Sequence, residues 1–226
     1  MHIVCTSDLH GYLPDVPPCD LLLVAGDVCP CWDHNVHFQW DWLDTTFRRW
    51  LEAAPARHIV GTWGNHDRVA QERPWIGDDL PWTCLVDDRT VVDGVTIFGS
   101  PWSPTFHDWA WMAEERELVE KYEAIQATDE IVLSHCPPLG VRDVVDGPHL
   151  GSMALTLRLG VTAPALTVCG HIHSGYGVEL VGDDCWVVNA AHLTETYLPN
   201  NPPIGLTYFR ESRTVVPYAF LDSVPS

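Results

Sequence analysis

The sequence is poor in positive charge. Among its 226 residues, 12 are Lys or Arg and 31 are Asp or Glu, which gives a formal net charge of −19 at pH 7; Lys121 is the single lysine. Such a surface repels nucleic-acid backbones and anionic lipids. We therefore expect neither a long nucleic acid nor a membrane as a partner. A phosphoryl ligand would need a local positive centre, which bound divalent cations can supply.

Other absences narrow the class further. No apolar run reaches the roughly 18–20 residues that a membrane-spanning helix needs. The first seven residues already read as a strand, without a basic region or a cleavage site, so we expect no secretory leader, a cytoplasmic location and reduced thiols. The eight cysteines include no CxxC pair, which argues against a structural zinc knuckle. Cys29 and Cys31 could sense oxidation, but two ordinary loop thiols are the favoured interpretation.

Length and hydrophobic pattern indicate one folded unit. At 226 residues the chain can bury a substantial core, and we expect a single domain over residues 1–226. Helices are expected over 35–53, 114–125 and 152–159, and most of the 11 tryptophans are expected to pack in the core. Asp93-Gly94 predicts a hairpin turn, and residues 99–104 a loop. Strands are expected over 83–86, 90–92, 95–98, 178–181, 185–189, 206–209 and 214–219.

Five short apolar runs each end on residues of the kind that bind metals. The runs 3–7, 21–25, 58–63, 130–134 and 166–169 lead in turn into Asp8-Leu9-His10, Gly26-Asp27, Gly64-Asn65-His66-Asp67, His135 and Gly170-His171-Ile172-His173. Buried strands read as continuous Val, Ile and Leu, and sites in layered α/β sheets gather outside the carboxyl ends of strands. The pattern therefore predicts one metal centre assembled from across the chain.

The expected ligands are oxygen and imidazole donors, with no thiolate among them. That donor set suits Mn, with Fe, Zn or Ni as alternatives. An Asp carboxylate can bridge two divalent ions about 3.5–4 Å apart, which together hold a phosphoryl group and activate a water. A histidine beside the ions that is not a ligand can protonate the leaving oxygen.

These five blocks resemble the calcineurin-like metallophosphoesterase superfamily, whose pattern D-x-H, G-D, G-N-H-[DE], H and G-H-x-H they match in order. One block alone would be weak evidence, whereas five in order are specific. The resemblance implies a first metal held by Asp8, His10, Asp27 and His173. It implies a second metal held by Asp27, Asn65, His135 and His171, with Asp27 as the bridge. It places His66 as the catalytic acid, with Asp67 as a further catalytic or supporting residue.

The resemblance also implies a fold and an activity. The superfamily fold belongs to the α+β class: an α/β/β/α sandwich of two packed mixed β-sheets flanked by helices, with the metals at strand carboxyl ends. Residues 99–102, 134–140, 170–177, 189–191 and 201–204 are similar to the metallophosphoesterase-domain-containing branch. Members of that branch are linked to hydrolysis of phosphodiesters, including cyclic nucleotides. One member of that branch has weak catalytic activity because a histidine of its G-H-x-H motif is replaced. His171 and His173 are both present in this chain.

The chain departs from the serine/threonine protein phosphatases at one position. Those enzymes carry G-D-x-x-D-R-G, whose second Asp supports the catalytic histidine, and Pro30 stands there in this chain. This argues against a phosphoprotein phosphatase and leaves the partner of His66 open. His34 and His37 are interpreted as solvated helix residues. His149 and His192 are weaker candidates for contact with substrate.

Three functional hypotheses remain in competition. The leading one is a dinuclear metal-dependent phosphodiesterase that hydrolyses small phosphodiesters. A phosphomonoesterase or pyrophosphatase on a small nucleotide is the alternative, weakened by the absence of a Lys/Arg cluster to clamp a polyphosphate. From another class, the chain could be a non-catalytic scaffold that binds a nucleotide or a protein partner. The presence of the whole ligand set and of His66 counts against that. No feature of the sequence bears on the oligomeric state.

Overall fold

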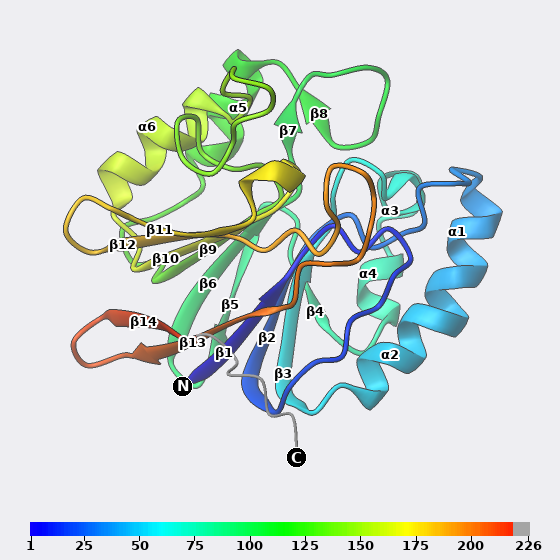
Figure 1. Cartoon of the computed structure of the whole chain (residues 1–226), viewed down its shortest axis with the longest axis horizontal. Helices are drawn as coiled ribbons and strands as arrows, with labels where there is room; N and C mark the ends of the chain where they lie inside the picture. Colours follow the sequence, from blue (N-terminus) through cyan, green and yellow to red (C-terminus); the bar gives the residue numbers. More distant parts are fainter. Residues whose placement is uncertain (219–226) are drawn as a thin grey trace.

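The computed structural model describes residues 1–218 and contains two six-stranded sheets packed face to face (Figure 1). The strands of the first sheet lie in the order β14 (Thr214–Tyr218), β13 (Ile204–Phe209), β1 (His2–Thr6), β2 (Cys19–Ala25), β3 (Ala56–Thr62) and β4 (Thr83–Cys84). Those of the second lie in the order β11 (Gly177–Val181), β12 (Cys185–Asn189), β10 (Leu166–Cys169), β9 (Ile131–Ser134), β6 (Val95–Ser100) and β5 (Asp88–Val92). A small separate sheet pairs β7 (Ser103–Pro104) with β8 (Met112–Ala113).

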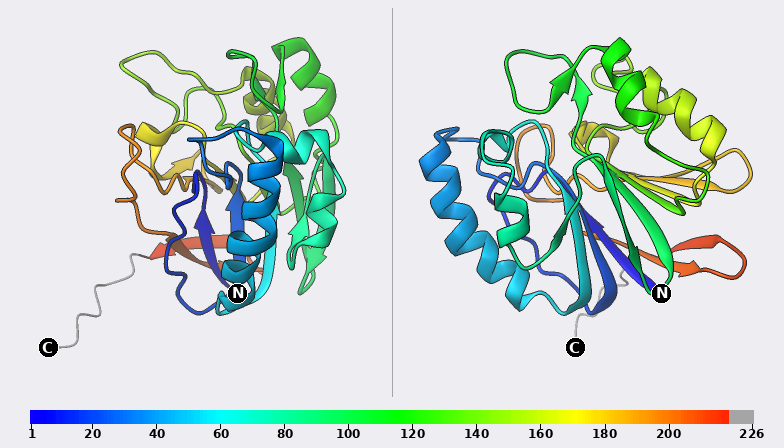
Figure 2. Two further views of the ribbon diagram at one scale, coloured as in Figure 1. Left: turned by 90° about the vertical axis from the view of Figure 1, so that its right-hand side faces the viewer. Right: turned by 180° about the vertical axis from the view of Figure 1, so that it is seen from behind.

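Helices cover the outer face of each sheet (Figures 1 and 2). The first sheet is covered by α1 (Val36–Trp42), the π-helix η1 (Leu43–Phe47), α2 (Arg48–Ala53), α3 (Arg68–Glu72) and α4 (Ile76–Asp79). The second sheet is covered by α5 (Glu115–Tyr122) and α6 (Met153–Thr162). A 3-10 turn, η2 (His173–Gly175), follows β10. The expected α/β/β/α sandwich is confirmed.

The inner strands are buried on both faces. Successive side chains point to opposite sides of a sheet, and one side packs against the other sheet while the other side packs against helices. In β2, Leu21 and Leu23 belong to the core between the two sheets, whereas Leu22 and Val24 pack under the helices of the first sheet. Strands of this kind read as continuous apolar runs rather than alternating ones. This is why the strands that carry the site were visible in the sequence.

Parallel pairing brings the carboxyl ends of five strands to one edge of the sandwich. In the first sheet, β1 and β2 are parallel, and so are β2 and β3. In the second sheet, β9 is parallel to both β6 and β10. The five apolar runs of the sequence correspond to β1, β2, β3, β9 and β10. The loops that follow these strands therefore meet at the same edge, where sites of layered α/β folds are found.

Most local predictions are confirmed, with differences at element ends. Val92 pairs with Val95 across Asp93-Gly94, whose φ values of 48° and 83° are those a two-residue hairpin turn requires. Asn35 caps α1 by accepting the backbone N–H groups of His37 and Phe38. The prediction of one continuous helix over 35–53 is wrong in detail, because η1 interrupts it with a π-helical turn. The apolar face continues through that turn, since Leu43 and Phe47 are both buried.

Two other predictions need correction or restriction. The loop expected over 99–104 is wrong in part, since β6 runs through Ser100 and residues 103–104 form β7. The final expected strand, 214–219, is found as β14 up to Tyr218, and Ala219 lies outside the described residues. The tryptophans behave as expected: Trp63 and Trp111 are buried, and five others pack against the core beneath the helices of the first sheet.

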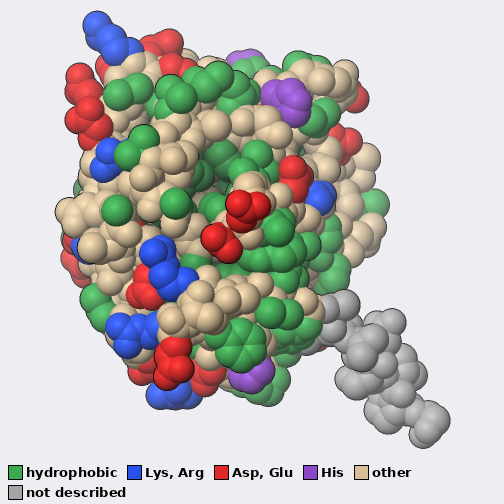
Figure 3. Space-filling view, turned by 90° about the vertical axis from the view of Figure 1, so that its left-hand side faces the viewer, with side chains coloured by type: hydrophobic (Ala, Val, Ile, Leu, Met, Phe, Trp, Pro, Cys, Tyr) green, Lys and Arg blue, Asp and Glu red, His purple; other side chains and the backbone are tan. Residues whose placement is uncertain are grey.

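One surface hollow lies away from the loops that follow β1, β2 and β3. It has a volume of about 480 Å³ and opens between α6 and the turn from β11 to β12. Figure 3 shows this side of the molecule, where hydrophobic side chains lie beside acidic ones. None of the predicted metal ligands lines this hollow. Within residues 1–218, no helix is long and apolar enough to cross a membrane.

Candidate metal centre

The loops that follow β1 and β2 are joined by backbone hydrogen bonds at the edge of the sandwich where the strand carboxyl ends meet. The backbone N–H of Asp8 donates to the carbonyl of Gly26 at 2.9 Å, and that of His10 donates to the carbonyl of Asp27, also at 2.9 Å. Asp8, His10 and Asp27 all have left-handed backbone, with φ values of 51°, 43° and 52°. Left-handed backbone in residues other than Gly costs free energy and concentrates at functional sites. The chain thus turns sharply at three predicted ligands.

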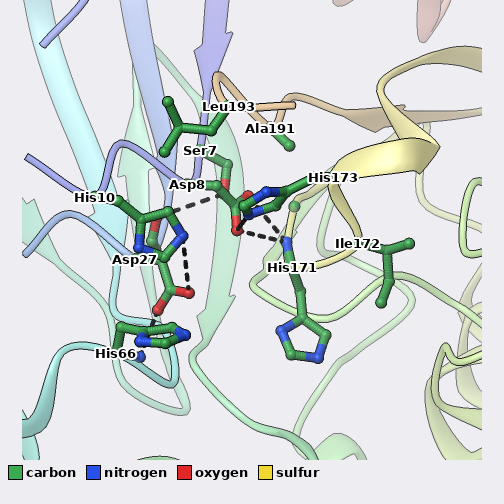
Figure 4. Close-up of polar contacts among 12 residues, drawn as sticks. Ser7, Asp8, His10, Asp27, His66, His171, Ile172, His173, Ala191 and Leu193 are labelled. Atoms are coloured by element: carbon green, nitrogen blue, oxygen red, sulfur yellow. Dashed lines mark hydrogen bonds and ion pairs between the residues drawn. The ribbon is translucent and has the colours of Figure 1, made fainter. Parts of the chain in front are cut away.

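Two overlapping groups of side chains could each hold a metal ion. Ligand atoms of Asp8, His10 and His173 all lie within 4.8 Å of one another, and so do those of Asp8, Asp27 and His135. Figure 4 shows Asp8, His10, Asp27 and His173 gathered at this edge. His173 Nε2 is 3.3 Å from Asp8 Oδ1, and His135 Nε2 is 3.4 Å from Asp27 Oδ2. Asp8 is the member common to both groups, whereas the sequence prediction made Asp27 the bridge. Asp27 nevertheless lies between them, since its Oδ2 is also 3.7 Å from His10 Nε2.

The remaining predicted ligands lie at the margin of these groups. Asn65 Oδ1 is 2.9 Å from His135 Nε2, which brings the amide to the second group. His171 donates its backbone N–H to the Asp8 carboxylate, at 2.9 Å and 3.0 Å to the two oxygens. The His171 ring faces that of His135, with centroids 5.0 Å apart, but it belongs to neither three-residue group among the described residues. Five of the seven predicted ligands thus converge, and two are adjacent.

His10 provides the structural test of whether a metal fits. Its side chain is 1% exposed, and neither ring nitrogen has a hydrogen-bond partner within the described residues. Buried polar groups are nearly always paired, so an unpaired imidazole here calls for a ligand. Burial lowers the pKa of His10 to about 3, which leaves the ring neutral with a lone pair to donate. The residues present therefore fit a bound cation.

Charge also favours a cation at this edge. Burial opposes ionisation of Asp8, but the hydrogen bond from His173 and the charges of His173 and His135 lower its pKa to about 2. For Asp27, burial is likewise outweighed by neighbouring histidines, which hold its pKa well below the usual value. Two ionised carboxylates are thus buried within one small volume.

Hydrogen bonds to backbone carbonyls fix the orientation of two histidine ligands. His135 Nδ1 is 2.8 Å from the carbonyl of Ala25, and His173 Nδ1 is 3.0 Å from that of Thr194. A carbonyl can only accept, so each Nδ1 carries a proton. Burial works against ionisation of both rings, but the facing carboxylates raise the pKa of His135 to about 9 and also raise that of His173. The carboxylates thus favour a second proton on each Nε2, whose place a bound cation would take. A carbonyl that accepts from Nδ1 is the usual outer-shell arrangement around histidines that bind metals.

His66 lies over the two groups without belonging to either. Its backbone N–H donates to Asp27 Oδ1 at 2.7 Å, and its ring centroid is 4.9 Å from that of His10. The side chain is 7% exposed, so it borders on solvent. This is the position that the prediction of a catalytic acid requires, and the role itself stays a prediction.

Asp67 occupies a different position. Its buried carboxylate accepts the backbone N–H groups of Val28, Cys29 and Gly64, at 3.3, 2.8 and 2.8 Å. These donors come from the loops after β2 and β3, so Asp67 holds the two loops together. Burial and the charge of Asp27 raise its pKa to about 7, although the backbone donors work in the opposite direction. Its predicted catalytic role stays a prediction, and its contacts are those of a residue that supports the ligand loops.

His34 differs from the expectation. It lies before the Asn35 cap of α1 rather than in the helix, and its Nε2 is 2.9 Å from His66 Nδ1. His34 is exposed as expected, but the expectation that it lies in the helix is wrong, and it contacts the site. His37 is an exposed residue of α1 as expected. The only hint in the sequence was that His34 follows the Gly26-Asp27 block by a few residues.

Other singled-out residues have structural contacts. His149 Nδ1 is 2.6 Å from Asp143 Oδ1, and His192 Nδ1 is 2.7 Å from the carbonyl of Asn201. Burial raises the pKa of the Cys29 thiol well above its ordinary value, and that of Cys31 as well. Reactive cysteines need the opposite shift, so the interpretation as ordinary loop thiols agrees with the structure.

Two aromatic rings at the site were not singled out in the sequence. The half-buried Trp109 has its ring centroid 4.5 Å from that of His66. Tyr197, which is 41% exposed, lies 5.3 Å from His10 and 5.1 Å from His173 between ring centroids. Both come from loops far from the ligand motifs, and aromatic residues in loops carry no pattern that marks them.

Known proteins share this sequence pattern and fold. Residues 1–175 match the Calcineurin-like phosphoesterase family. Metallophosphoesterase domain-containing protein 1 of Homo sapiens and that of Mus musculus are each 30% identical to the chain, over 89% of the chain and 69% of the relative. Among solved structures, a protein of Thermus thermophilus has a TM-score of 0.62 at 16% identity, covering 96% of this chain and 97% of that one.

The phosphopantetheinyl hydrolase of Mycobacterium tuberculosis has a TM-score of 0.59 at 14% identity, covering 99% of this chain and 98% of that one. At these identities the two structures bear on the fold alone. The match over residues 1–175 and the identity to the two curated relatives bear on the family. Divalent metal ions are implied for that family, in agreement with the two ligand groups. The chain therefore belongs to the calcineurin-like phosphoesterase family, as a metallophosphoesterase-type hydrolase.

Proposed function

We propose that this chain is a dinuclear, metal-dependent phosphodiesterase that hydrolyses small phosphodiesters such as cyclic nucleotides. The observation that carries the proposal is that two ligand groups share Asp8 and that His66 contacts a member of each, His10 in one and Asp27 in the other. Asp8, His10 and His173 would hold one ion, and Asp8, Asp27 and His135 the other, with Asn65 and His171 completing the second set. Asp27 lies between the two groups and would serve both ions. When bound, two divalent ions would supply the positive charge that holds a phosphoryl group and activates water for in-line displacement.

The proposed task of His66 is to move one proton. The ring would donate from Nε2 to the leaving oxygen as the phosphorus–oxygen bond breaks, so that an alcohol departs rather than an alkoxide. The backbone of His66 is held on both sides: its N–H donates to Asp27, and its carbonyl accepts from Gln39 Nε2 at 2.7 Å. These two contacts keep the ring above the ligand groups without making it a ligand.

The scarcity of cationic side chains supports a diester with a single negative charge. Arg68 lines the hollow beside His66, but its guanidinium is already 3.7 Å from Glu72 and 3.9 Å from Asp108. A monoester or a polyphosphate carries more negative charge and would meet stronger repulsion from a protein of net charge −19. The substrate proposed is therefore a small monoanionic diester.

The rings of Trp109 and Tyr197 support a nucleotide-like substrate. They contact different residues of the site: Trp109 lies near His66, and Tyr197 lies near His10 and His173. Aromatic rings stack on nucleobases regardless of base identity, with about 1–3 kcal/mol per base. Mn²⁺ is the proposed ion, because the donors are carboxylate, amide and imidazole without thiolate.

A substrate panel tests the proposal. Purified protein is stripped of metal, reconstituted with Mn²⁺, Fe²⁺, Zn²⁺ or Ni²⁺, and assayed on 2′,3′-cyclic and 3′,5′-cyclic nucleotides, bis(p-nitrophenyl) phosphate and p-nitrophenyl phosphate. We expect faster hydrolysis of diesters than of monoesters, highest with Mn²⁺. A preference for the monoester with every metal would assign the chain as a phosphomonoesterase. No turnover with any metal, together with tight nucleotide binding, would support a scaffold.

A further inference from the structure

We propose that His34 is the positioning residue of His66, holding the ring so that its Nε2 faces the leaving group. The inference rests on the proposed function of His66 as the proton donor. It is carried by the 2.9 Å contact between His34 Nε2 and His66 Nδ1, with the ring centroids 5.1 Å apart and the ring planes 36° apart. At that distance one proton lies between the two nitrogens.

The two histidines are brought together by a connected framework. Asn35, next to His34, accepts the N–H groups of His37 and Phe38 and so fixes where α1 begins. Gln39 in the same helix donates to the carbonyl of His66 at 2.7 Å and accepts the N–H of Val69 at 3.0 Å. Through Gln39, α1 is thereby hydrogen-bonded to the carbonyl of His66 and to the N–H of Val69. The contact between the rings is therefore set by ordered elements.

Proton counting gives the contact a function. A histidine that gives its Nε2 proton to a leaving oxygen is left as a neutral ring only if Nδ1 carries a proton of its own. Before the transfer, His66 Nδ1–H donates to His34 Nε2, while His66 Nε2–H is free for the substrate. When the Nε2–H bond breaks and the O–H bond of the leaving alcohol forms, the Nδ1–H bond to His34 is kept throughout. His34 thus ensures that Nε2 is the nitrogen that exchanges the proton.

This arrangement answers the question left by Pro30. In the protein phosphatases a carboxylate follows the G-D block and supports the catalytic histidine, and here the loop after Asp27 brings an imidazole to the same kind of contact. An imidazole can accept a hydrogen bond as a carboxylate does. Unlike a carboxylate, it adds no further negative charge beside Asp8 and Asp27, which are already two buried carboxylates in one site.

The test compares His34→Ala and His34→Gln with His37→Ala as the matched control, since His37 is an exposed histidine three residues away in the same segment. Each variant is assayed on a 2′,3′-cyclic nucleotide, whose leaving alkoxide needs a proton, and on bis(p-nitrophenyl) phosphate, whose leaving group does not. For His34→Ala we expect kcat on the cyclic nucleotide to fall about 10–100-fold, part of what general acid catalysis contributes. KM, metal content and the nitrophenyl rate should stay within about threefold.

His34→Gln should recover part of the loss, because its amide oxygen can accept from His66 Nδ1. Equal losses on both substrates, loss of metal, or no loss on the cyclic nucleotide would overturn the proposal.

A second measurement keeps the positioning role separate from the proposed activity. Metal-free protein labelled with ¹⁵N-histidine is examined by long-range ¹H–¹⁵N NMR, with His66→Ala identifying the His66 signals. We expect His34→Ala to shift the His66 Nδ1 signal and change the tautomer balance, and His37→Ala to leave both unchanged. If the wild-type protein hydrolyses neither substrate, the proposed function fails while this spectrum still tests the contact. An unchanged His66 signal in His34→Ala would refute the positioning role.

Discussion

Replacing Gly170 with alanine should displace the metal ligand Asp8, although no ligand residue is itself replaced. A Cβ at Gly170 would lie 2.0 Å from Asp8 Oδ2 and 2.0 Å from Ser7 Oγ, both far inside van der Waals contact. Ordinary contact begins near 3.4 Å, so the Asp8 carboxylate or the Gly170 backbone must move by about 1.4 Å. Asp8 cannot move freely, because it accepts the N–H of His171 and lies 3.3 Å from His173.

The expected loss of metal and activity in Gly170→Ala follows from how little displacement of a ligand atom a metal site tolerates. Metal–oxygen distances hold within about 0.2 Å of their ideal values, so a displacement of over an ångström removes Asp8 from the ligand set. Asp8 is common to both candidate groups, and its displacement weakens both. We expect metal content to fall from about two ions to below one and diester hydrolysis to fall at least about 100-fold. Overpacking should lower the free energy of unfolding by about 1–3 kcal/mol.

The assay measures metal content by mass spectrometry, diester hydrolysis and urea unfolding on the same preparations. Gly160→Ala is the matched control: Gly160 lies in α6, and among the described residues nothing beyond its chain neighbours and the backbone of its own helix lies within 4 Å of its added Cβ. That variant should keep metal and activity and gain about 0.5–1 kcal/mol of stability, since alanine is the better helix former. A Gly170→Ala protein with two ions and full activity would refute the packing argument.

Three further predictions follow from the same contacts. Asp27→Ala should lose both ions and nearly all activity, because Asp27 contacts His10 and His135 and accepts the N–H of His66; metal analysis that still finds two ions would exclude a shared role. Asp67→Ala should lower the free energy of unfolding by about 3 kcal/mol or more, since three buried N–H groups lose their acceptor. Urea denaturation measures this change, and a loss under about 1 kcal/mol would contradict the prediction. Chelation should preserve the near-UV circular dichroism but lower the melting temperature, with recovery on adding Mn²⁺, whereas collapse of the near-UV signal would mean that metal is needed for the fold.

Much of the fold could be predicted because the strands that carry the site are buried on both faces. Such strands stand out as continuous apolar runs, and their ends mark the site edge. The Asp93-Gly94 hairpin was also predictable, since it depends on local backbone chemistry. The π-helical turn at η1 was not, because a π turn and an α turn can bury the same apolar residues. The two-residue strands β7 and β8 are too short to leave a pattern.

The ligands were predictable and their surroundings were not. Ligand types recur in motifs, whereas the contact between His34 and His66 depends on how α1 packs against the loop after β3. The motif glycines also have a reason that no sequence pattern states. Gly170 leaves room for Asp8, and a Cβ at Gly64 would lie 2.4 Å from Asp27 Oδ1. These glycines are required for space at the carboxylates, which is a property of the folded molecule.

The hydrogen bonds of the described residues explain why a strained site can persist. Left-handed backbone at Asp8, His10 and Asp27 costs roughly 1 kcal/mol or more for each residue. The loops offset part of this cost through backbone hydrogen bonds from Asp8 and His10, and through the three N–H groups that Asp67 accepts. None of these bonds involves a donor atom needed for a cation. The ligand atoms are therefore held in place by contacts behind them, which is the arrangement that preorganised sites require.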